Sequence, residues 1–175
     1  MVAKNKFLIA FIGPVGSGKT YIARILARKL GAVHVRADDI RVALRRRGKT
    51  ASISAVRRIG AEKMKEGFRR GKSAVSDFDA VLPKRRRELA RFAKRYGAKA
   101  VFIKVETPEK IILERLRKHR YTKKDLFQNA EEAVSVYFMR RKFHQRKLKR
   151  RPDFVINNAR PLGPQIKKII KKLRN

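Results

Sequence analysis

Short apolar segments alternate along the chain with longer segments in which apolar residues recur every three or four positions. The apolar segments predict five β-strands, at Lys6–Ile12, Ala32–Arg36, Ser73–Asp77, Lys99–Val105 and Asp153–Asn157. The periodic segments predict α-helices at residues 18–30, 39–47, 51–71, 83–96, 108–119, 123–148 and 162–174. This alternation is typical of a mostly parallel sheet with helices on both faces. We therefore predict an α/β fold in one domain over residues 1–175, because no internal repeat or linker divides the chain.

Local signals predict some of the helix ends. Thr107 has the position of an N-cap, with Pro108 in the first turn of the following helix. Thr122 and Asp125 have the spacing of a capping box, with Asp in place of the usual Glu or Gln. In the last helix, one face is apolar and is expected to pack on the sheet, through Leu162, Ile166, Ile169, Ile170 and Leu173.

The composition is that of a globular protein with many charged residues. It is 43% hydrophobic and 36% charged, and no apolar run approaches the ~18 residues that a membrane span needs. The N-terminus has no signal-peptide pattern. Cysteine is absent, which excludes disulfides and thiolate zinc sites. We therefore expect a cytoplasmic protein with no membrane partner.

Net charge is the extreme feature of the chain. Lys and Arg number 49 against 14 Asp and Glu, a formal charge of +35. Such an excess destabilises the compact state by self-repulsion unless anions accompany it. A nucleic acid would supply those anions, because neutralising its phosphates releases counterions. A generally cationic, solvated surface is the alternative.

The basic residues are densest near the end of the long predicted helix at about 123–150. Eight of the twelve residues in Arg140–Arg151 are Lys or Arg. They could guide a nucleic acid through phosphate contacts, or form a solvated face with Phe143 and Leu148 turned to the core. Further cations lie in Arg45–Arg47 and Lys84–Arg87, and at Lys167, Lys168, Lys171 and Lys172.

The segment Gly13–Thr20, GPVGSGKT, joins the first predicted strand to the first predicted helix and matches G-x-x-x-x-G-K-[ST]. Glycines let backbone N–H groups turn toward a phosphate, and the following helix adds its N-terminal dipole. Lys19 can reach the β- and γ-phosphates, and the Thr20 hydroxyl can bind Mg²⁺. The alternative is a glycine-rich turn with a solvated lysine. We therefore predict ATP and Mg²⁺ as cofactors, with the nucleotide held by Gly13, Pro14, Val15, Gly16, Ser17, Gly18, Lys19, Thr20 and Tyr21.

P-loops of this kind serve GTPases, larger ATPases and small kinases. The chain lacks the N-K-x-D motif of GTPases and is short for a larger ATPase. A small kinase needs a base on the acceptor side, cations and a mobile cover. Asp38 and Asp39 follow the second strand at the sheet edge that binds ligands. Asp38 could accept a hydroxyl proton and Arg41 could bind an acceptor phosphate, but an ordinary helix start is equally consistent with these residues.

Two further features fit a kinase. Asp77 ends the third strand and is expected beside the P-loop, where it could hold Mg²⁺ through water or orient Arg41. It could otherwise simply start the next loop. Arg115, Arg117 and Arg120 could cover the triphosphate as part of a helical lid at about residues 115–130. The alternative for these arginines is a solvated helix face.

Four segments in this order, GPVGSGKT, RADDIR, VSDFDAVLPKRRRELARFAKRYG and ERLRKHR, resemble the kinase domain of bacteriophage polynucleotide 5′-kinase. They are also similar to the wider group of P-loop kinases that includes zeta toxins. The resemblance spans about residues 7–120, with a looser match at DFVINN, and implies a five-stranded parallel sheet in the order 2-3-1-4-5. It implies that Asp38 is the general base, Arg41 binds the acceptor phosphate, Asp77 is the third-strand aspartate and Arg115 is the first lid arginine. Residues that the resemblance places beside the adenine are Asn157, Asn158 and Arg160.

The sequence departs from that family at two positions. His119 stands where the family has its second lid arginine, so Arg120 or Arg117 must substitute, or the lid works differently. Asp79 stands where the family often has Asn. The acceptor half of the match is shared by kinases with different substrates.

These features together predict a kinase that transfers the γ-phosphoryl group of ATP to a hydroxyl. The predicted acceptor is the 5′-OH of RNA or DNA. Two alternatives remain: a zeta-toxin-like kinase of a small phosphorylated metabolite or nucleotide sugar, and a nucleic-acid-binding ATPase without a phosphoryl acceptor. Predicted catalytic residues are Lys19, Asp38, Arg41, Asp77, Arg115 and Arg120, with Thr20 and Asp77 (through water) at the metal.

Overall fold

A computed structural model of the protein describes residues 5–122, 125–145, 148 and 151–174. Strands and helices alternate along most of these residues, as the hydrophobic pattern predicts. In chain order the elements are β1 (Lys6–Ile12), α1 (Lys19–Leu30), β2 (Val33–Val35), α2 (Ala37–Arg46), α3 (Ile53–Arg69), β3 (Ala74–Asp79), α4 (Pro83–Arg95), β4 (Ala98–Glu106), α5 (Glu109–Lys118), α6 (Ala130–Gln145), β5 (Phe154–Asn157) and α7 (Leu162–Arg174).

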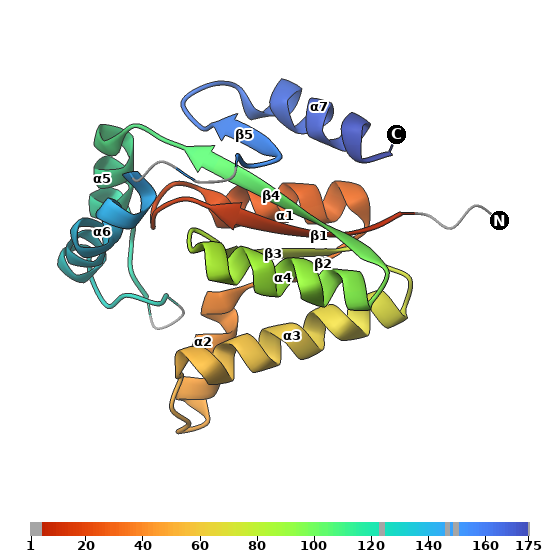
Figure 1. Ribbon diagram of the computed structural model, residues 1–175. Helices are drawn as coiled ribbons and strands as arrows, with labels where there is room; N and C mark the ends of the chain where they lie inside the picture. Colours follow the sequence, from red (N-terminus) through yellow and green to blue (C-terminus); the bar gives the residue numbers. More distant parts are fainter. Residues whose placement is uncertain (1–4, 123–124, 146–147, 149–150, 175) are drawn as a thin grey trace.

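The five strands form one parallel sheet in the order β2-β3-β1-β4-β5, which confirms the expected fold class and strand order (Figure 1). β1 is the central strand, with Leu8 paired to Ala74 of β3 and to Ala100 of β4. Its apolar sequence suits this position, because a central parallel strand is covered on both faces. The register between β1 and β3 shifts after Ala10, close to the end of β3 that carries the aspartates.

Helices cover both faces of the sheet. α1 and α7 pack on one face around a core that includes Phe11, Leu26 and Ile166. α2, α3 and α4 cover the other face around a second core that includes Leu8 and Phe68. Figure 1 shows α5 and α6 side by side at the end of the sheet toward which the strands point, and they share a third apolar cluster. This end is where parallel α/β sheets bind ligands.

The start of α6 differs from the prediction. The spacing of Thr122 and Asp125 suggests a helix from residue 123, but α6 begins at Ala130. The Asp125 carboxylate accepts hydrogen bonds from the Thr122 backbone N–H at 2.8 Å and hydroxyl at 2.9 Å, and these close a turn that does not continue as a helix. Residues 123–124 of the predicted helix and 146, 147, 149 and 150 of the basic tract lie outside the described residues.

The prediction for the start of α5 is also wrong. Pro108, not Thr107, is the N-cap residue, and its helix has no side-chain cap. The Thr107 hydroxyl instead donates to the Ser17 carbonyl at 2.9 Å, a contact with the P-loop. Thr107 therefore binds the P-loop instead of capping α5.

Other packing predictions are confirmed. Ile166, Ile169 and Leu173 of α7 are buried against the sheet. Phe143 and Leu148 are partly buried and pack against the core cluster that includes Leu8 and Phe68, so part of the basic tract does face inward.

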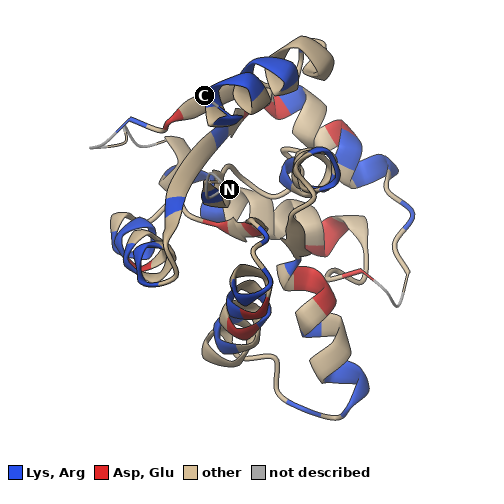
Figure 2. Cartoon of the chain, turned by 90° about the vertical axis from the view of Figure 1, so that its right-hand side faces the viewer, with Lys and Arg blue, Asp and Glu red and all other residues tan. Residues whose placement is uncertain are grey.

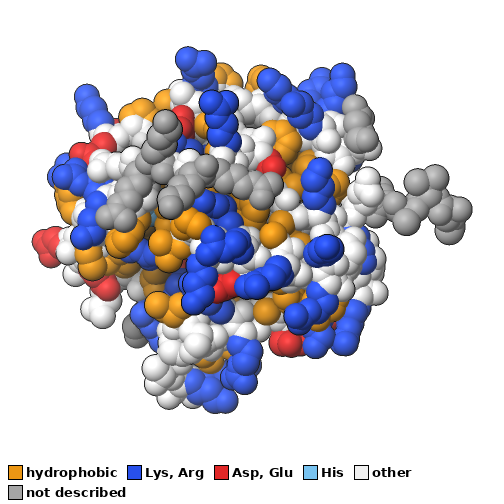
Figure 3. Space-filling view, in the orientation of Figure 1, with side chains coloured by type: hydrophobic (Ala, Val, Ile, Leu, Met, Phe, Trp, Pro, Cys, Tyr) orange, Lys and Arg blue, Asp and Glu red, His pale blue; other side chains and the backbone are white. Residues whose placement is uncertain are grey.

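Positive charge is spread widely over the molecule. Lys and Arg occur on helices at both faces of the sheet (Figure 2), and in the space-filling view they are scattered over the visible surface (Figure 3). α7 carries Lys171, Lys172 and Arg174 in its last turn and no acidic residue in its first. None of the helices within the described residues combines the length and apolarity needed to cross a membrane.

Candidate active site

The loop between β1 and α1 depends on its glycines. Gly18 has a φ of 92°, in the left-handed region that L side chains rarely adopt. A Cβ there would collide with the Asn158 amide nitrogen and lie 3.5 Å from the Arg115 guanidinium. A Cβ at Gly13 would lie 2.8 Å from the Ser17 Oγ. Glycine at these two positions therefore lets the loop pack closely against the Asn158 and Ser17 side chains.

Lys19 folds back onto this loop. Its ammonium donates to the carbonyls of Gly13 at 2.6 Å and Pro14 at 2.7 Å. Burial lowers the pKa of Lys19, while the carboxylates of Asp79, Asp77 and, more weakly, Asp38 act to raise it. The ammonium is thus enclosed among carbonyls and carboxylates rather than directed into bulk water.

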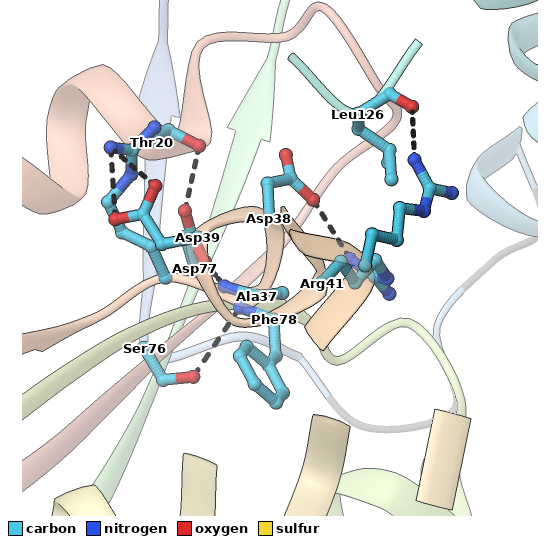
Figure 4. Close-up of polar contacts among 11 residues, drawn as sticks. Thr20, Ala37, Asp38, Asp39, Arg41, Ser76, Asp77, Phe78 and Leu126 are labelled. Carbon is cyan, nitrogen blue, oxygen red and sulfur yellow. Dashed lines mark hydrogen bonds and ion pairs between the residues drawn. The ribbon is translucent and has the colours of Figure 1, made fainter. Parts of the chain in front are cut away.

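Asp77, at the end of β3, connects the P-loop helix to α2. One carboxylate oxygen accepts from the Thr20 hydroxyl at 2.8 Å and the other from the Ala37 backbone N–H at 2.9 Å. Asp77 is buried, and Figure 4 shows it between Thr20 and Ala37. The carboxylate therefore lies beside the hydroxyl that is the candidate metal ligand.

The two aspartates after β2 have different surroundings. The Arg41 guanidinium donates to Asp38 at 2.8 Å, and both side chains face the cavity described below (Figure 4). Burial raises the pKa of Asp38, an effect that the neighbouring Arg41 charge opposes but does not cancel. Asp39 instead pairs with Arg36 at 3.0 Å on the surface. Asp38 is therefore the candidate base, and Asp39 is a surface residue outside the cavity.

A cavity of about 460 Å³ lies between the P-loop, α2 and α6. Besides the loop residues, it is lined by Asp38, Arg41 and Asp77. Much of the remaining wall comes from positions that the sequence analysis did not assign to the site. These are Ile53, Val56 and Arg57 of α3, Phe78 and Asp79 of β3, Arg85 of α4, Leu126 and Phe127, and Val136, Tyr137, Arg140 and His144 of α6.

No local motif marks these wall residues. Arg85 belongs to the basic run Lys84–Arg87, and Arg140 and His144 belong to the basic tract, so composition flags them only as charge. They converge through long-range packing of α3, α4 and α6 at the carboxyl end of the sheet.

α6 contacts the site through Asp79. The His144 Nε2 lies 3.3 Å from the Asp79 carboxylate, and the Arg140 guanidinium lies 3.9 Å from it. Burial acts to raise the pKa of Asp79, but the His144 hydrogen bond and the Lys19 charge outweigh it, so the pKa is lowered. Asp79 Oδ1 and His144 Nδ1 are buried without a hydrogen-bond partner among the described residues.

The lid arginines separate in the structure. Arg115, in the last turn of α5, reaches the P-loop beside Gly18. Arg115, Arg117 and Arg120 are all exposed and none of them lines the cavity, so the contact near Gly18 is what distinguishes Arg115. His119, at the position of the expected second lid arginine, lies 2.9 Å from Asp125. The structure therefore brings Arg115 to the site and does not bring Arg120 there.

The segment after β5 lies against the P-loop. The Asn158 amide donates to the Ser17 carbonyl at 2.7 Å, the same carbonyl that accepts from Thr107. The Asn157 backbone makes two hydrogen bonds with the Gln165 side chain: its N–H donates to the amide oxygen at 2.9 Å, and its carbonyl accepts from the amide nitrogen at 3.0 Å. Arg160 is exposed near this turn. The position of these three residues beside the P-loop is compatible with contacts to the nucleotide base.

Tyr21 differs from the loop residues before it. The residue is 52% exposed, and the Arg24 guanidinium lies 5.4 Å from the centroid of its ring. Tyr21 does not line the cavity described above.

The residues present fit a nucleotide phosphate chain and Mg²⁺. The Ser17 hydroxyl is buried and lacks a hydrogen-bond partner within the described residues, and it lies in the loop that leads to Lys19 and Thr20. The Thr20 hydroxyl and the Asp77 carboxylate are the hard oxygen groups that Mg²⁺ prefers. No cluster of three or more His, Cys, Asp or Glu able to hold a metal occurs among the described residues. Mg²⁺ would therefore take its other ligands from phosphate and water.

Comparisons with known proteins agree with this architecture. The AAA_33 family model, described as an AAA domain, matches residues 8–155. A UPF0200 protein of Aeropyrum pernix is 31% identical over 140 residues, which cover 75% of this chain and 74% of that protein.

Solved structures of kinases share the fold. A sugar kinase from Janibacter sp. HTCC2649 has a TM-score of 0.61 and 20% identity, covering 95% of this chain and 93% of its own. The APS kinase CysC of Mycobacterium tuberculosis, solved with AMPPNP and APS, has a TM-score of 0.62 and 17% identity, covering 98% and 99%. A gluconokinase from Sinorhizobium meliloti 1021 has a TM-score of 0.61 and 14% identity, covering 98% and 92%. The chain therefore belongs to the AAA domain family and has the α/β fold of P-loop kinases.

Proposed function

We propose that the protein is an ATP-dependent kinase that phosphorylates a hydroxyl of a small acceptor. One observation carries this proposal: the P-loop with its Thr20–Asp77 pair and the Asp38–Arg41 pair line the same cavity. A phosphate donor and a hydroxyl acceptor could therefore meet there.

The nucleotide half of the reaction would use the loop between β1 and α1. Its backbone N–H groups and Lys19 would bind phosphate oxygens, the ammonium exchanging its two carbonyl partners for them. Thr20 and Asp77 would hold Mg²⁺. When bound, Mg²⁺ would neutralise charge on the phosphates. Arg115 lies where its guanidinium could neutralise further negative charge near Gly18.

The acceptor half would use Asp38 as general base. Arg41 holds one carboxylate oxygen of Asp38, which leaves the other to accept the hydroxyl proton. Because burial raises the pKa of Asp38, this carboxylate is a stronger base than an ordinary aspartate. The proton would move from the acceptor oxygen to Asp38 as that oxygen bonds to the γ-phosphorus of ATP, while the bond from this phosphorus to the bridging oxygen breaks and ADP leaves.

The size and cover of the cavity favour a small acceptor. Its volume of about 460 Å³ is in the usual range for small-molecule sites, roughly 300–1,000 Å³. α6 and the Leu126–Phe127 segment contribute to its wall. The sugar kinase, APS kinase and gluconokinase that share the fold are consistent with this choice. It revises the acceptor favoured by the sequence, a polynucleotide 5′-OH.

A polynucleotide acceptor remains the second candidate because of one observation, the net charge of +35. The charge is scattered over the surface shown in Figure 3 rather than gathered at one edge of the molecule. Salt dependence separates the two candidates. Affinity for a polynucleotide should fall roughly tenfold or more for each few phosphates contacted as salt rises, whereas affinity for a small acceptor should fall much less.

The proposal is tested with γ-labelled ATP, a set of hydroxyl acceptors and two neighbouring variants. Asp38→Asn should reduce transfer by about 10²–10⁴-fold while Mg·ATP binding persists. Asp39→Asn is the matched control, since Asp39 forms a surface pair outside the cavity, and should transfer at the wild-type rate. If the label appears only as inorganic phosphate for every acceptor, the protein is an ATPase and the kinase proposal is wrong.

A further inference from the structure

We propose that Arg57 and Arg85 form a subsite for a phosphate monoester group of the acceptor. This inference rests on the proposed kinase function and names the class of its substrate. The acceptor would carry a phosphate monoester in addition to the hydroxyl that is phosphorylated. The subsite lies in the wall that α3, β3 and α4 contribute to the cavity.

The basic run at the start of α4 is divided by the fold into three roles. Lys84 and Arg87 are exposed. Arg86 is buried and donates to the carbonyls of Ala80 and Val81, at 3.0 and 2.7 Å. Arg85 lines the cavity, and only 12% of its side chain is exposed. Because Arg86 fastens the turn from β3 to α4, the backbone that carries Arg85 is fixed.

Arg57 is exposed but lines the same cavity from α3, a helix whose backbone is also fixed. One turn after Arg57, a Cβ on Gly60 would lie 2.7 Å from the Phe78 ring, so the helix packs directly on the end of β3. No ion pair among the described residues involves Arg57. The acidic residues of its own helix, Glu62 and Glu66, pair instead with Lys65 and Arg70.

Among the described residues, only one ion pair involves either Arg57 or Arg85, so one of these two charges has no acidic partner. Arg85 has one acidic partner, Glu88, at 3.3 Å. Burial lowers the pKa of Arg85, and the positive charge of Arg57 lowers it further, which places the two guanidinium groups within electrostatic range of each other. Arg41, the other cation of this wall, is already paired with Asp38. A dianion between Arg57 and Arg85 would relieve their repulsion and offer several charge-assisted hydrogen bonds.

The neighbouring wall is apolar. Val56 and Phe78 are buried, and Ile53 is 66% exposed at the first residue of α3 although it is a large hydrophobic side chain. An acceptor with apolar surface next to its phosphate would cover Ile53. A free hydroxyl elsewhere on the same molecule would face Asp38.

Binding tests the subsite without any catalytic turnover. The protein would be saturated with Mg·AMPPNP, which occupies the P-loop, and titrated with inorganic phosphate by calorimetry. The double variant Arg57→Gln, Arg85→Gln should bind phosphate about 100-fold more weakly than wild type, since each lost bond to a charged group is worth roughly tenfold or more. The double variant Lys84→Gln, Arg87→Gln removes the same charge from exposed positions and should bind like wild type. Equal phosphate affinity in the two double variants would overturn the subsite, as would no binding to wild type.

Transfer tests the substrate class. Matched acceptors such as uridine and uridine 5′-monophosphate differ only in the phosphate, and only the phosphorylated member should accept label efficiently. With it, the Arg57→Gln, Arg85→Gln variant should raise the acceptor KM about 100-fold and leave the ATP KM unchanged. Equal transfer to both members would reject the subsite and leave the kinase proposal standing. Phosphate binding that needs the two arginines, without transfer to any acceptor, would reject the kinase and leave the anion site standing.

Discussion

Asp77 is predicted to have a structural role and a metal-binding role that two substitutions can separate. Its carboxylate accepts from the Thr20 hydroxyl and from the Ala37 backbone N–H at the start of α2. Asp77→Ala removes both acceptors and leaves a buried N–H and a half-buried hydroxyl without a partner. Asp77→Asn keeps an oxygen for Ala37 and an amide group that can donate to Thr20, so it removes mainly the charge.

The magnitudes follow from these contacts. An unsatisfied buried polar group costs about 1–3 kcal/mol, so Asp77→Ala should lower the free energy of unfolding by about 2–4 kcal/mol. At 2–4 °C per kcal/mol for a chain of this size, the melting temperature should fall by roughly 4–16 °C. Asp77→Asn should stay within about 1 kcal/mol of wild type. It should nevertheless weaken Mg·ATP binding about 10–100-fold, the usual effect of removing a partner from the outer shell of a metal.

Thermal unfolding of the free protein and calorimetric titration with Mg·ATP measure the two effects separately. Asp39→Ala serves as the control, because Asp39 is exposed and pairs only with Arg36 at the surface. If Asp77→Ala is as stable as wild type, the hydrogen bonds described for Asp77 do not support the fold. If Asp77→Asn binds Mg·ATP as tightly as wild type, Asp77 is not a partner of the metal.

Three further predictions concern single positions. Burial raises the pKa of Asp38, so as pH is lowered the transfer rate should begin to fall above the pKa of an ordinary aspartate, ~3.9. The same shift makes the fold less stable as pH rises through this range. A pH profile of single-turnover rates whose acid limb lies at or below the ordinary value would contradict this prediction. Gly60→Ala should destabilise the fold by up to about 2 kcal/mol, because overpacking against β3 of about 1–3 kcal/mol exceeds the ~1 kcal/mol gain in helix propensity. Urea unfolding that gave Gly60→Ala a stability equal to or above that of wild type would refute the packing argument. Gly18→Ala should abolish measurable ATP binding by calorimetry, because a Cβ at this positive φ would strain the loop and collide with the Asn158 amide nitrogen, and wild-type affinity would show that this loop geometry is not needed.

The sequence predicts the framework of the fold well because the framework rests on local patterns. β1 begins and ends where the apolar run Lys6–Ile12 does, and the glycines of the P-loop identify the turn that follows it. The family resemblance supplied the strand order, which hydrophobic periodicity does not determine. These features depend on residues close together in the chain.

The errors arise where a short signal has two structural meanings. Thr122 and Asp125 form a capped turn, but the turn does not start a helix. Thr107 has the sequence of a helix cap, yet its hydroxyl binds a carbonyl of the P-loop, 90 residues away in the chain. In each case the side chain makes a hydrogen bond that the motif allows, but the wider packing selects which one.

The acceptor side of the site was the least predictable part. Asp38 and Arg41 were identified from their position after β2, but nothing local distinguishes Arg85 from its neighbours Lys84 and Arg87. Only the packing of α4 decides which of these cations faces the cavity. With a net charge of +35, cations are too common along the chain for composition to identify the ones that line the site.

The central claim is that the P-loop and Asp38 present ATP and acceptor to each other in one cavity. A crystal structure with Mg²⁺ and AMPPNP tests it most directly. We predict that the Lys19 ammonium leaves the carbonyls of Gly13 and Pro14 for phosphate oxygens, with the γ-phosphate facing Asp38. A nucleotide bound elsewhere, with Lys19 still on those two carbonyls, would contradict the account.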